Sequence, residues 1–535
     1  MKRLRGFIYR RSLFLGLALL VQILFLFFAA RSFFEASYLA SAASLLLSVV
    51  AVLWILNDSS NSAYKLAWII PILIFPVFGG LFYFFFGRTR LGGRLGRALK
   101  AGRSPPEPRP QDGNREVRNA DPLLEDPGEA RQAAYLSLKA SSPLLPAERL
   151  VYHSSGEAAF EAILEALESA ERSIYMEFFI IEEGMMWSAI LEILERKAKE
   201  GLDVRVMYDD FGCASKLPWK YYRYLEGKGI ACAVFNPMRI LLSFQINHRD
   251  HRKIVVVDGT RGFTGGLNLA DEYINEVERF GHWKDCALEV GGKAAGRLQE
   301  LFLRLWEPAR KAMGMPLSPP ASAGLKQEGK RQSEESAKGG RGMPVSRGFP
   351  DISPGWIQVY EDSPEDDEAL GENVYLGIIN RASSYVFITT PYLIPSAEMV
   401  AALCLAAKSG IDLRIMTPGI PDKWYVHAVS RANYLPLLRA GVRIYEYSLG
   451  FVHSKTFVSD DRAAVVGTIN LDFRSLYLHF ECGARLYGGP VIPALKEDFI
   501  STLESCREIR VEDIEAEPIL KRAQGWVLRF FSPMM

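Results

Sequence analysis

Two stretches of this 535-residue chain carry the same polar residues at the same spacing. In each, a lysine follows a histidine by two positions, an aspartate follows the histidine by seven, and an asparagine follows it by seventeen. The first copy comprises His251, Lys253, Asp258 and Asn268, and the second comprises His453, Lys455, Asp460 and Asn470. Two ordinary surface strands have no reason to repeat polar residues in one register. The repeat therefore predicts a duplicated unit with a shared function.

The spacing within each copy is typical of a β-strand. Residues i and i+2 of a strand share a face, so the histidine and the lysine of each copy point into the same space. The residues between the lysine and the aspartate are rich in β-formers and predict the body of the strand. Two halves packed about a pseudo-twofold axis would bring both histidines, both lysines and both asparagines into one cleft.

Such a cleft has the groups that phosphoryl-transfer chemistry needs. Two lysine ammonium groups and amide donors form an anion site suited to a phosphate. Of two imidazoles flanking a phosphorus atom, one can attack and the other can donate a proton. We predict a catalytic set of His251, Lys253, Asp258, His453, Lys455 and Asp460, with the lysines, Asn268 and Asn470 binding the phosphoryl oxygens. Because the two aspartates end their strands, their position favours anchoring of the following turn over catalysis.

Hydrophobic periodicity in the body alternates between helix and strand, which predicts an α/β layer fold. Helices are expected at 158–171, 187–201 and 396–408, and strands at 173–181, 203–209, 384–389 and 411–416. We predict two similar repeats, each a sheet flanked by helices, that form one pseudo-twofold catalytic unit. The expected boundaries are 1–103 for a membrane anchor, 104–146 for a tether, 147–315 for repeat 1, 316–350 for a flexible linker, 351–512 for repeat 2 and 513–535 for a C-terminal amphipathic helix.

Three long runs near the N-terminus contain no charged residue: 19 residues at 12–30, 19 at 38–56 and 21 at 66–86. A helix needs about 20 apolar residues to cross a bilayer, which favours transmembrane helices over buried core helices. Basic residues flank both ends of this region, and three spans cannot place both flanks on one side. Either one segment does not cross, or one basic flank is outside. Six bases without an acid follow the last run, which favours a multi-pass protein of the cell membrane with a cytoplasmic body.

Charge and cysteine usage argue against other classes of protein. The net charge is +1, from 63 Lys+Arg and 62 Asp+Glu, whereas a nuclease needs a basic groove. The six cysteines form no C-x2-C pair, so we expect no zinc or other metal. There is no P-loop, and we expect no cofactor. The C-terminal helix has basic residues among its apolar ones, and either lies on anionic lipid or packs on the body.

The duplicated motif resembles that of the phospholipase D superfamily, and the chain most resembles the bacterial cardiolipin synthases. The similarity extends to Tyr64-Lys-Leu-Ala-Trp68, Glu177-Phe-Phe-Ile180, Asn268-Leu-Ala-Asp-Glu-Tyr273, Pro391-Tyr-Leu-Ile-Pro395 and Asn470-Leu-Asp-Phe-Arg-Ser475. The chain departs from the family in its third apolar run, in its long linker, and in His479, where the family often has asparagine. These departures do not touch the duplicated motif.

The resemblance implies transfer of a phosphatidyl group between two phosphatidylglycerol molecules, giving cardiolipin and glycerol. It implies that His251 forms a phosphohistidine and that His453 donates and then accepts the proton. It also implies that Asp285 and Glu481 each support the histidine of the other half. The lipid partners are phosphatidylglycerol, cardiolipin and the bilayer, with no nucleic acid. The alternatives are a hydrolytic phospholipase D, another phosphatidyltransferase, or a non-enzymatic membrane scaffold.

Overall fold

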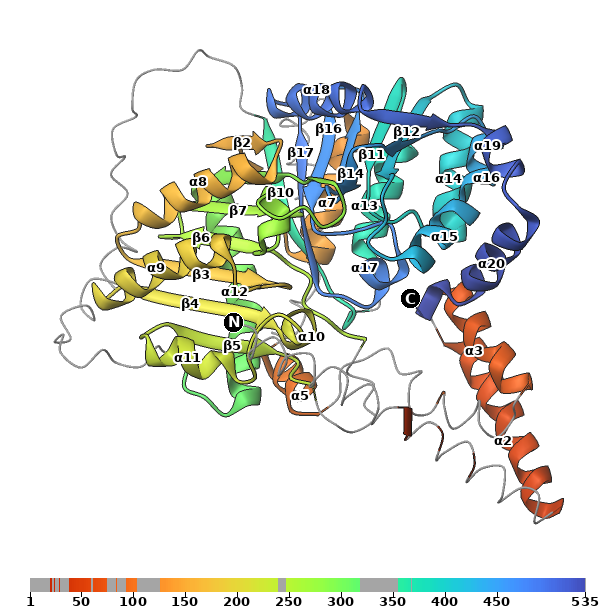
Figure 1. Ribbon diagram of the computed structural model, residues 1–535, viewed down its shortest axis with the longest axis horizontal. Helices are drawn as coiled ribbons and strands as arrows, with labels where there is room; N and C mark the ends of the chain where they lie inside the picture. The colour runs from red at the N-terminus through yellow and green to blue at the C-terminus, as the bar shows by residue number, and fades with distance from the viewer. Residues whose placement is uncertain are drawn as a thin grey trace.

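The two halves of the body fold into two sheets in the computed structural model (Figure 1). The structure describes residues 38–58, 61–74, 93–102, 126–238, 247–317, 355–366 and 368–534, together with residues 20, 21, 24, 28 and 83. The helices and strands expected in the body are all present, with ends within three residues of the predicted ones. The α/β prediction is therefore confirmed.

The first half forms a seven-stranded sheet in the order β2-β9-β7-β6-β3-β4-β5. Strands β3, β4 and β5 pair in parallel, and the other pairs are antiparallel. The strands are β2 (Leu150–His153), β3 (Ser173–Phe178), β4 (Asp203–Asp209), β5 (Ala231–Phe235), β6 (Ile254–Val257), β7 (Arg261–Gly265) and β9 (Ala287–Gly291).

The second half repeats this order within a nine-stranded sheet, β1-β10-β17-β16-β15-β11-β12-β13-β18. Its seven strands from β10 to β13 correspond one by one to those of the first sheet, and β1 and β18 extend its edges. The strands are β1 (Leu145–Pro146), β10 (Trp356–Asp362), β11 (Tyr385–Thr389), β12 (Asp412–Pro418), β13 (Arg443–Tyr447), β15 (Thr456–Ser459), β16 (Ala463–Gly467), β17 (Glu481–Tyr487) and β18 (Cys506–Ile509).

Helices flank both sheets, and several begin at side chains that cap free backbone N–H groups. Ser155 accepts a hydrogen bond from the N–H of Ala158, and Ser396 accepts one from the N–H of Met399. The first half contains α8 (Gly156–Glu168), α9 (Met185–Lys199), α10 (Asp210–Cys213), α11 (Tyr221–Gly227), η2 (Asp271–Ile274) and α12 (Gly292–Met313). The second contains α13 (Leu370–Ile379), α14 (Ala397–Lys408), α15 (Trp424–Ala432), α16 (Tyr434–Arg439), α17 (Phe473–Tyr477), α18 (Val491–Leu503), α19 (Val511–Glu515), α20 (Ile519–Phe530) and η3 (Ser532–Met534).

One hydrophobic core is shared by the two halves. Leu301 and Phe302 of α12 are fully buried in the same cluster as Ile357 and Val359 of β10. Arg297 of α12 also donates a hydrogen bond to the backbone oxygen of Val359. Burying this apolar surface stabilises the association of the halves, at about 25 cal/mol per Å² removed from water. The two repeats therefore form one unit.

Short strands also pair across the two halves. β8 (His282–Lys284) of the first half pairs in parallel with β14 (Gly450–Val452) of the second. A second parallel bridge joins Asp250, next to the motif of the first half, to Phe480 of the second half. Each half thus contributes one segment next to its own motif and one segment next to the motif of the other half.

Parts of the predicted anchor and tether belong to the folded body. α5 (Gly93–Gly102) packs on α12, and Leu95 and Leu99 are buried in the shared core. α7 (Pro127–Ala140) packs on β10, and β1 pairs with β10. These two segments, which the predicted boundaries at 103 and 146 assign to the anchor and the tether, therefore have alanine- and leucine-containing faces that the body covers.

The remaining N-terminal helices are α2 (Tyr38–Asn57) and α3 (Ser62–Ile74). They extend from the body beside the C-terminal end of the chain (Figure 1). Among the residues that the structure describes, no helix has both the length and the apolar character needed to cross a membrane. Most of the predicted span at 12–30 and the second half of that at 66–86 lie outside the described residues.

The C-terminal amphipathic helix is present as α20, and it packs on α15. Gly525 is its buried contact point, where a Cβ atom would lie 3.1 Å from the backbone oxygen of Ala428. Its other face is open, since Ile519 and Leu520 are 77% and 81% exposed. The helix therefore contacts the body, as one of the two alternatives predicts, and it leaves an apolar face uncovered; contact of this face with anionic lipid stays a prediction.

The aspartates that end the two motifs hold the sheets together at the start of neighbouring strands. Asp258 has a φ of 53° and accepts hydrogen bonds from the N–H groups of Glu171, Arg172 and Ser173, just before and at the start of β3. Asp460 has a φ of 54° and accepts bonds from Ser383, Ser384 and Tyr385, just before and at the start of β11. These backbone donors hold the pKa of both carboxyl groups below the ordinary value despite partial burial.

We expect Asp258→Ala to lower the free energy of unfolding by about 1–2 kcal/mol, because it removes three backbone hydrogen bonds and places alanine at a left-handed φ. Asp258→Asn should lose less, since asparagine tolerates this φ and keeps one carbonyl acceptor. Thermal unfolding of the detergent-solubilised protein measures the difference. Equal melting temperatures for the alanine variant and the unmodified protein would contradict the anchoring role.

Candidate active site

The two motifs lie at matching places in the two sheets. His251 and Lys253 immediately precede β6, and His453 and Lys455 lie between β14 and β15. β6 and β15 occupy the same position in the strand order of their sheets. The apolar residues after each lysine form the strand, as predicted, and they fix the polar residues at its start. All four side chains are buried, with at most 7% of any residue exposed.

Backbone hydrogen bonds between the halves position each histidine against a carboxylate. The N–H of His251 donates to the oxygen of Phe480 at 2.9 Å, and the N–H of His453 donates to the oxygen of Lys284 at 2.7 Å. In each case the accepting residue directly precedes an acidic residue of the other half. These acidic residues are Glu481 and Asp285.

The side chains then complete two crossed pairs. His251 Nδ1 lies 2.8 Å from Oε1 and 3.0 Å from Oε2 of Glu481. His453 Nδ1 lies 2.7 Å from Oδ2 of Asp285. An ionised carboxylate only accepts hydrogen bonds, so these contacts favour the tautomer with the proton on Nδ1 and the lone pair on Nε2. The ammonium nitrogen of Lys455 also lies 2.9 Å from Nδ1 of His453. The two pairs form the crossed arrangement that the resemblance implies, and they leave Nε2 of each ring outside the histidine–carboxylate contact.

The two lysines contribute buried positive charge beside these rings. The ammonium group of Lys253 donates to the backbone oxygen of His251, and that of Lys455 donates to the backbone oxygen of His453. Burial lowers the pKa of Lys253 to about 7 and that of Lys455 to about 8, although Glu481 and Asp285 act in the opposite direction. A bound anion would restore the charged form, so the lysines are suited to hold a phosphate.

Burial and the lysines also keep the imidazoles neutral. Burial lowers the pKa of His453 to about 4, and the ammonium group of Lys455 contributes in the same direction. The pKa of His251 lies well below its ordinary value for the same reasons, with Lys253 and Lys455 both nearby. Burial alone would raise the pKa of Asp285, but His453, Lys455 and the N–H of Cys286 hold it below the ordinary value. A neutral ring beside an ionised carboxylate is the form required of a nucleophile.

The two predicted asparagines differ in their contacts. Asn268 uses its oxygen to accept from the N–H of Ile180 at 3.1 Å, and its amide donates to the hydroxyl of Tyr273 at 2.7 Å. Asn470 is buried, and its side-chain oxygen has no hydrogen-bond partner among the residues that the structure describes. Two hydrogen bonds therefore hold Asn268 in one orientation and leave one of its amide N–H groups available. No hydrogen bond from a described residue restrains the side-chain oxygen of Asn470.

Asp258 and Asp460 lie outside this cluster. Their carboxylates accept bonds from backbone groups at the far ends of β6 and β15, as described above. Their place in the predicted catalytic set is corrected accordingly: the structure brings together His251, Lys253, His453, Lys455, Asp285 and Glu481, and leaves both motif aspartates at the opposite ends of the strands. The positional argument for anchoring describes them better.

The residues after each motif break the symmetry between the halves. Thr468 donates from its hydroxyl to Oε2 of Glu481, a contact that the sequence analysis missed. The matching residue is Gly266, where a Cβ atom would lie 2.0 Å from Oδ1 of Asp285 and 2.9 Å from the oxygen of His453. Aligning the two copies of the motif places Gly266 opposite Thr468, and this mismatch could have predicted that the two halves differ here.

The surroundings of the two imidazoles differ as well. The ring of His453 lies 5.3–5.9 Å from those of Tyr273, Trp283 and Phe451. The ring of His251 lies 5.2 Å from that of Phe179 and 5.6 Å from that of His479. The spacing of residues in the sequence did not predict these aromatic neighbours, because they come from separate segments of the chain.

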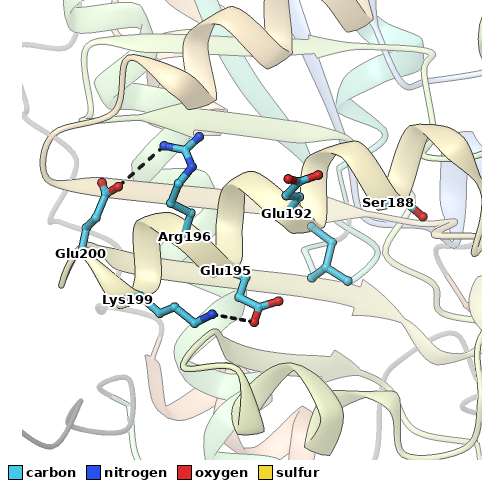
Figure 2. Close-up of a pocket in the computed structure, with 7 residues that line it drawn as sticks. Ser188, Glu192, Glu195, Arg196, Lys199 and Glu200 are labelled. Carbon is cyan, nitrogen blue, oxygen red and sulfur yellow. Dashed lines mark hydrogen bonds and ion pairs between the residues drawn. The ribbon is translucent and has the colours of Figure 1, made fainter.

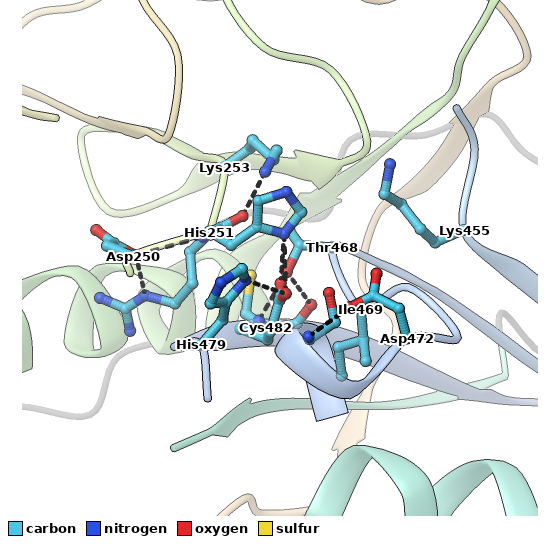
Figure 3. A network of polar contacts seen from close by, with 12 residues as sticks. Asp250, His251, Lys253, Lys455, Thr468, Ile469, Asp472, His479 and Cys482 are labelled. Carbon is cyan, nitrogen blue, oxygen red and sulfur yellow. Dashed lines mark hydrogen bonds and ion pairs between the residues drawn. The ribbon is translucent and has the colours of Figure 1, made fainter. Parts of the chain in front are cut away.

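His479 is a third imidazole in the network around His251 (Figure 3). It is 9% exposed, and within the described part of the chain neither of its ring nitrogens makes a hydrogen bond. Its Nδ1 lies 3.8 Å from Oε1 of Glu481. Burial lowers the pKa of His479 to about 3, so the ring is neutral at physiological pH.

A hollow on the surface of α9 has no part in this cluster (Figure 2). Its walls come from α9 alone, and its charged side chains pair with one another. Lys199 lies 3.0 Å from Glu195, and Arg196 lies 3.7 Å from Glu200. These are i,i+4 pairs of an ordinary solvated helix face.

Comparison with known proteins agrees with this geometry. A family model described as cardiolipin synthase, phospholipase D-like domain, matches residues 163–306 and 375–503, and thus both halves of the site. A cardiolipin synthase of Halalkalibacterium halodurans is 32% identical over 516 residues, which cover 95% of this chain and 96% of that protein. The chain belongs to the cardiolipin synthase family. Cardiolipin synthase 2 of Bacillus anthracis is 33% identical, covering 89% of this chain and 88% of that protein.

Two further matches extend the family assignment. A model described as phospholipase D–nuclease N-terminal matches residues 46–88. The crystal structure of phosphatidylserine synthase from Haemophilus influenzae superposes with a TM-score of 0.54 at 14% identity, covering 76% of this chain and 98% of that one. This structural likeness shows that the duplicated α/β fold of this cardiolipin synthase family member is shared with that protein.

Asp285→Asn and Glu481→Gln test whether each carboxylate supports the histidine of the other half. We expect each variant to lose about two to four orders of magnitude in turnover of a phosphodiester lipid, because an amide no longer enforces the Nδ1–H tautomer. Glu289→Gln is a matched control, since Glu289 is also buried and lies 3.1 Å from Nε2 of His153 outside the site. Turnover per folded molecule should be near normal in the control. Unimpaired turnover in Asp285→Asn would contradict the pairing.

Proposed function

We propose that this protein is a cardiolipin synthase that transfers a phosphatidyl group between two phosphatidylglycerol molecules, releasing glycerol. The observation that carries this proposal is the pair of buried histidines, each bonded through Nδ1 to a carboxylate of the other half, in a chain of the cardiolipin synthase family. Family membership also makes the protein a phosphatidyltransferase. Both the bond broken and the bond formed are phosphodiester bonds, so the reaction needs no nucleotide.

The first step forms a covalent intermediate on His251. Its Nε2 attacks the phosphorus of the donor lipid, the phosphorus–oxygen bond to glycerol breaks, and His453 donates a proton to the departing alkoxide. For this donation His453 must be protonated when the anionic substrate is bound. The bound phosphate opposes the effect of the lysines and favours that protonated form.

The second step reverses the roles of proton donor and acceptor. His453 takes a proton from a hydroxyl of the incoming phosphatidylglycerol, and the resulting oxygen attacks the phosphorus. The bond to His251 Nε2 then breaks, which regenerates the free enzyme. Asp285 and Glu481 keep both rings in one tautomer, and Lys253 and Lys455 stabilise the charge on the phosphoryl oxygens.

We further propose that the enzyme works at the bilayer, as a multi-pass protein of the cell membrane with a cytoplasmic body. The uncharged runs ahead of α5 support this, as do the exposed apolar side chains of α2, among them Leu47 and Trp54. The open face of α20 adds a second apolar surface, with Lys521 and Arg522 beside Ile519 and Leu520. Basic residues beside exposed apolar ones are suited to anionic lipid.

The test is incubation of the purified full-length protein with phosphatidylglycerol in detergent micelles. We expect cardiolipin and glycerol in equal amounts. Phosphatidic acid alone would instead identify a hydrolytic phospholipase D, and the absence of any turnover would favour a membrane scaffold. His251→Ala and His453→Ala should each abolish product formation.

The nucleophile is identified by trapping the phosphoenzyme and mapping the label. A label on His251 is expected, and a label on His453 would reverse the two roles. The control is His153→Ala, because His153 is also a part-buried histidine bonded to a carboxylate, but it lies outside the motif. That variant should give the same label as the unmodified protein.

The pH dependence follows from the lysines. Their ammonium forms bind the phosphate, and their lowered pKa values of about 7 and about 8 mean that charge is lost as the pH rises through this range. We expect kcat/KM for phosphatidylglycerol to fall above about pH 8, by up to tenfold per unit for each group. Lys455→Arg should flatten this fall, since arginine stays charged. A profile that is level to pH 10 would contradict the role of the lysines.

A further inference from the structure

His479 lies beside the catalytic cluster and approaches Glu481 without forming a hydrogen bond to it. It lies between α17 and β17, directly beside the ring of His251 (Figure 3). Both ring nitrogens are buried without a hydrogen bond among the residues that the structure describes. Burying a polar group without a partner is costly, so such a group calls for a ligand or a role. The mechanism proposed above uses neither nitrogen.

The position of His479 suits a metal ion shared with two of its neighbours. One donor atom each from His251, His479 and Glu481 lie within 4.8 Å of one another. Two of these separations are 2.8 Å, from Glu481 Oε1 to His251 Nδ1, and 3.8 Å, from the same oxygen to His479 Nδ1. Ligand atoms on a tetrahedral zinc ion are about 3.3 Å apart, given bonds of about 2.0 Å, and the two distances bracket this value.

We propose that His251, His479 and Glu481 form an inhibitory site for a divalent transition-metal ion of the zinc class. Two imidazoles and one carboxylate are a zinc donor set that leaves a position open for water. Mg²⁺ and Ca²⁺ prefer oxygen ligands and do not suit this set. The ammonium groups of Lys253 and Lys455 repel a cation while Glu481 attracts it, so we expect binding in the micromolar range.

Metal binding would remove His251 from catalysis. The proton on Nδ1 of His251 leaves to solvent, a bond from Nδ1 to the metal forms, and the hydrogen bond to Glu481 is lost. The ring then loses electron density to the metal, and Glu481 can no longer orient it. This inhibitory consequence rests on the proposed function, whereas the binding of the ion does not.

The site depends on the imidazole of His479. Asparagine is close to histidine in polarity but is a poor ligand for zinc. His479→Asn therefore removes one donor from the site. His427→Asn is the matched control, because His427 is also part-buried and its Nε2 lies 4.0 Å from Oε1 of Glu446, outside the active site.

Binding is measured first, without reference to activity. The full-length protein in detergent is dialysed against ZnCl2, and bound zinc is counted per chain. Co²⁺ is then added in its place, and the visible absorption of four- or five-coordinate cobalt is recorded. We expect one ion per chain and visible bands in the unmodified protein and in His427→Asn. In His479→Asn the affinity should fall by at least about tenfold.

Activity is measured second, as inhibition relative to each variant without metal. Turnover of phosphatidylglycerol should fall in parallel with zinc occupancy, and a chelator should restore it. Equal zinc affinity in His479→Asn and the unmodified protein would overturn the site, provided that both melt at similar temperatures. If zinc binds through His479 but the protein does not turn over phosphatidylglycerol, the metal site is supported and the proposed function is rejected.

Discussion

The active site depends on two backbone hydrogen bonds that cross between the halves. The N–H of each catalytic histidine donates to the residue just before the carboxylate of the other half. Because the bond fixes the register of the two segments, the next side chain must face the imidazole. The two pairs, His251 with Glu481 and His453 with Asp285, are thus built by chain pairing as much as by side-chain packing. Neither half alone contains both members of either of these two pairs.

Burial gives these pairs their chemical character. Two carboxylates, two lysines and two histidines lie in a space with little solvent, where charges interact far more strongly than in water. The lysines lower the tendency of the rings to take up a proton, and the carboxylates keep Nδ1–H in place. A substrate phosphate brings in negative charge and shifts this balance toward protonation. The empty site therefore favours neutral imidazoles, and bound negative charge favours protonated ones.

Much of the fold and of the site was predictable from the sequence, because the chain repeats one pattern twice. The strand after Lys253, the meeting of the two motifs and the anchoring role of Asp258 all follow from spacing. The packing of α5 and α7 on the body was not predictable, since a proline- and charge-rich sequence surrounds their short apolar faces. The meeting of His479 with His251 and Glu481 was also not predictable, because the spacing of residues in the chain says nothing of side chains that meet only through the fold.

Gly266 and Thr468 occupy matching positions in the two halves, but they contact the neighbouring carboxylate in different ways. A side chain at Gly266 would collide with Asp285, whereas the hydroxyl of Thr468 holds Glu481 from behind. Asp285 thus has a neighbour, Gly266, at which any side chain would collide with it, and Glu481 has a neighbour, Thr468, that donates a hydrogen bond to it. The two histidines of this duplicated fold therefore have different surroundings, although each pairs with a carboxylate of the other half.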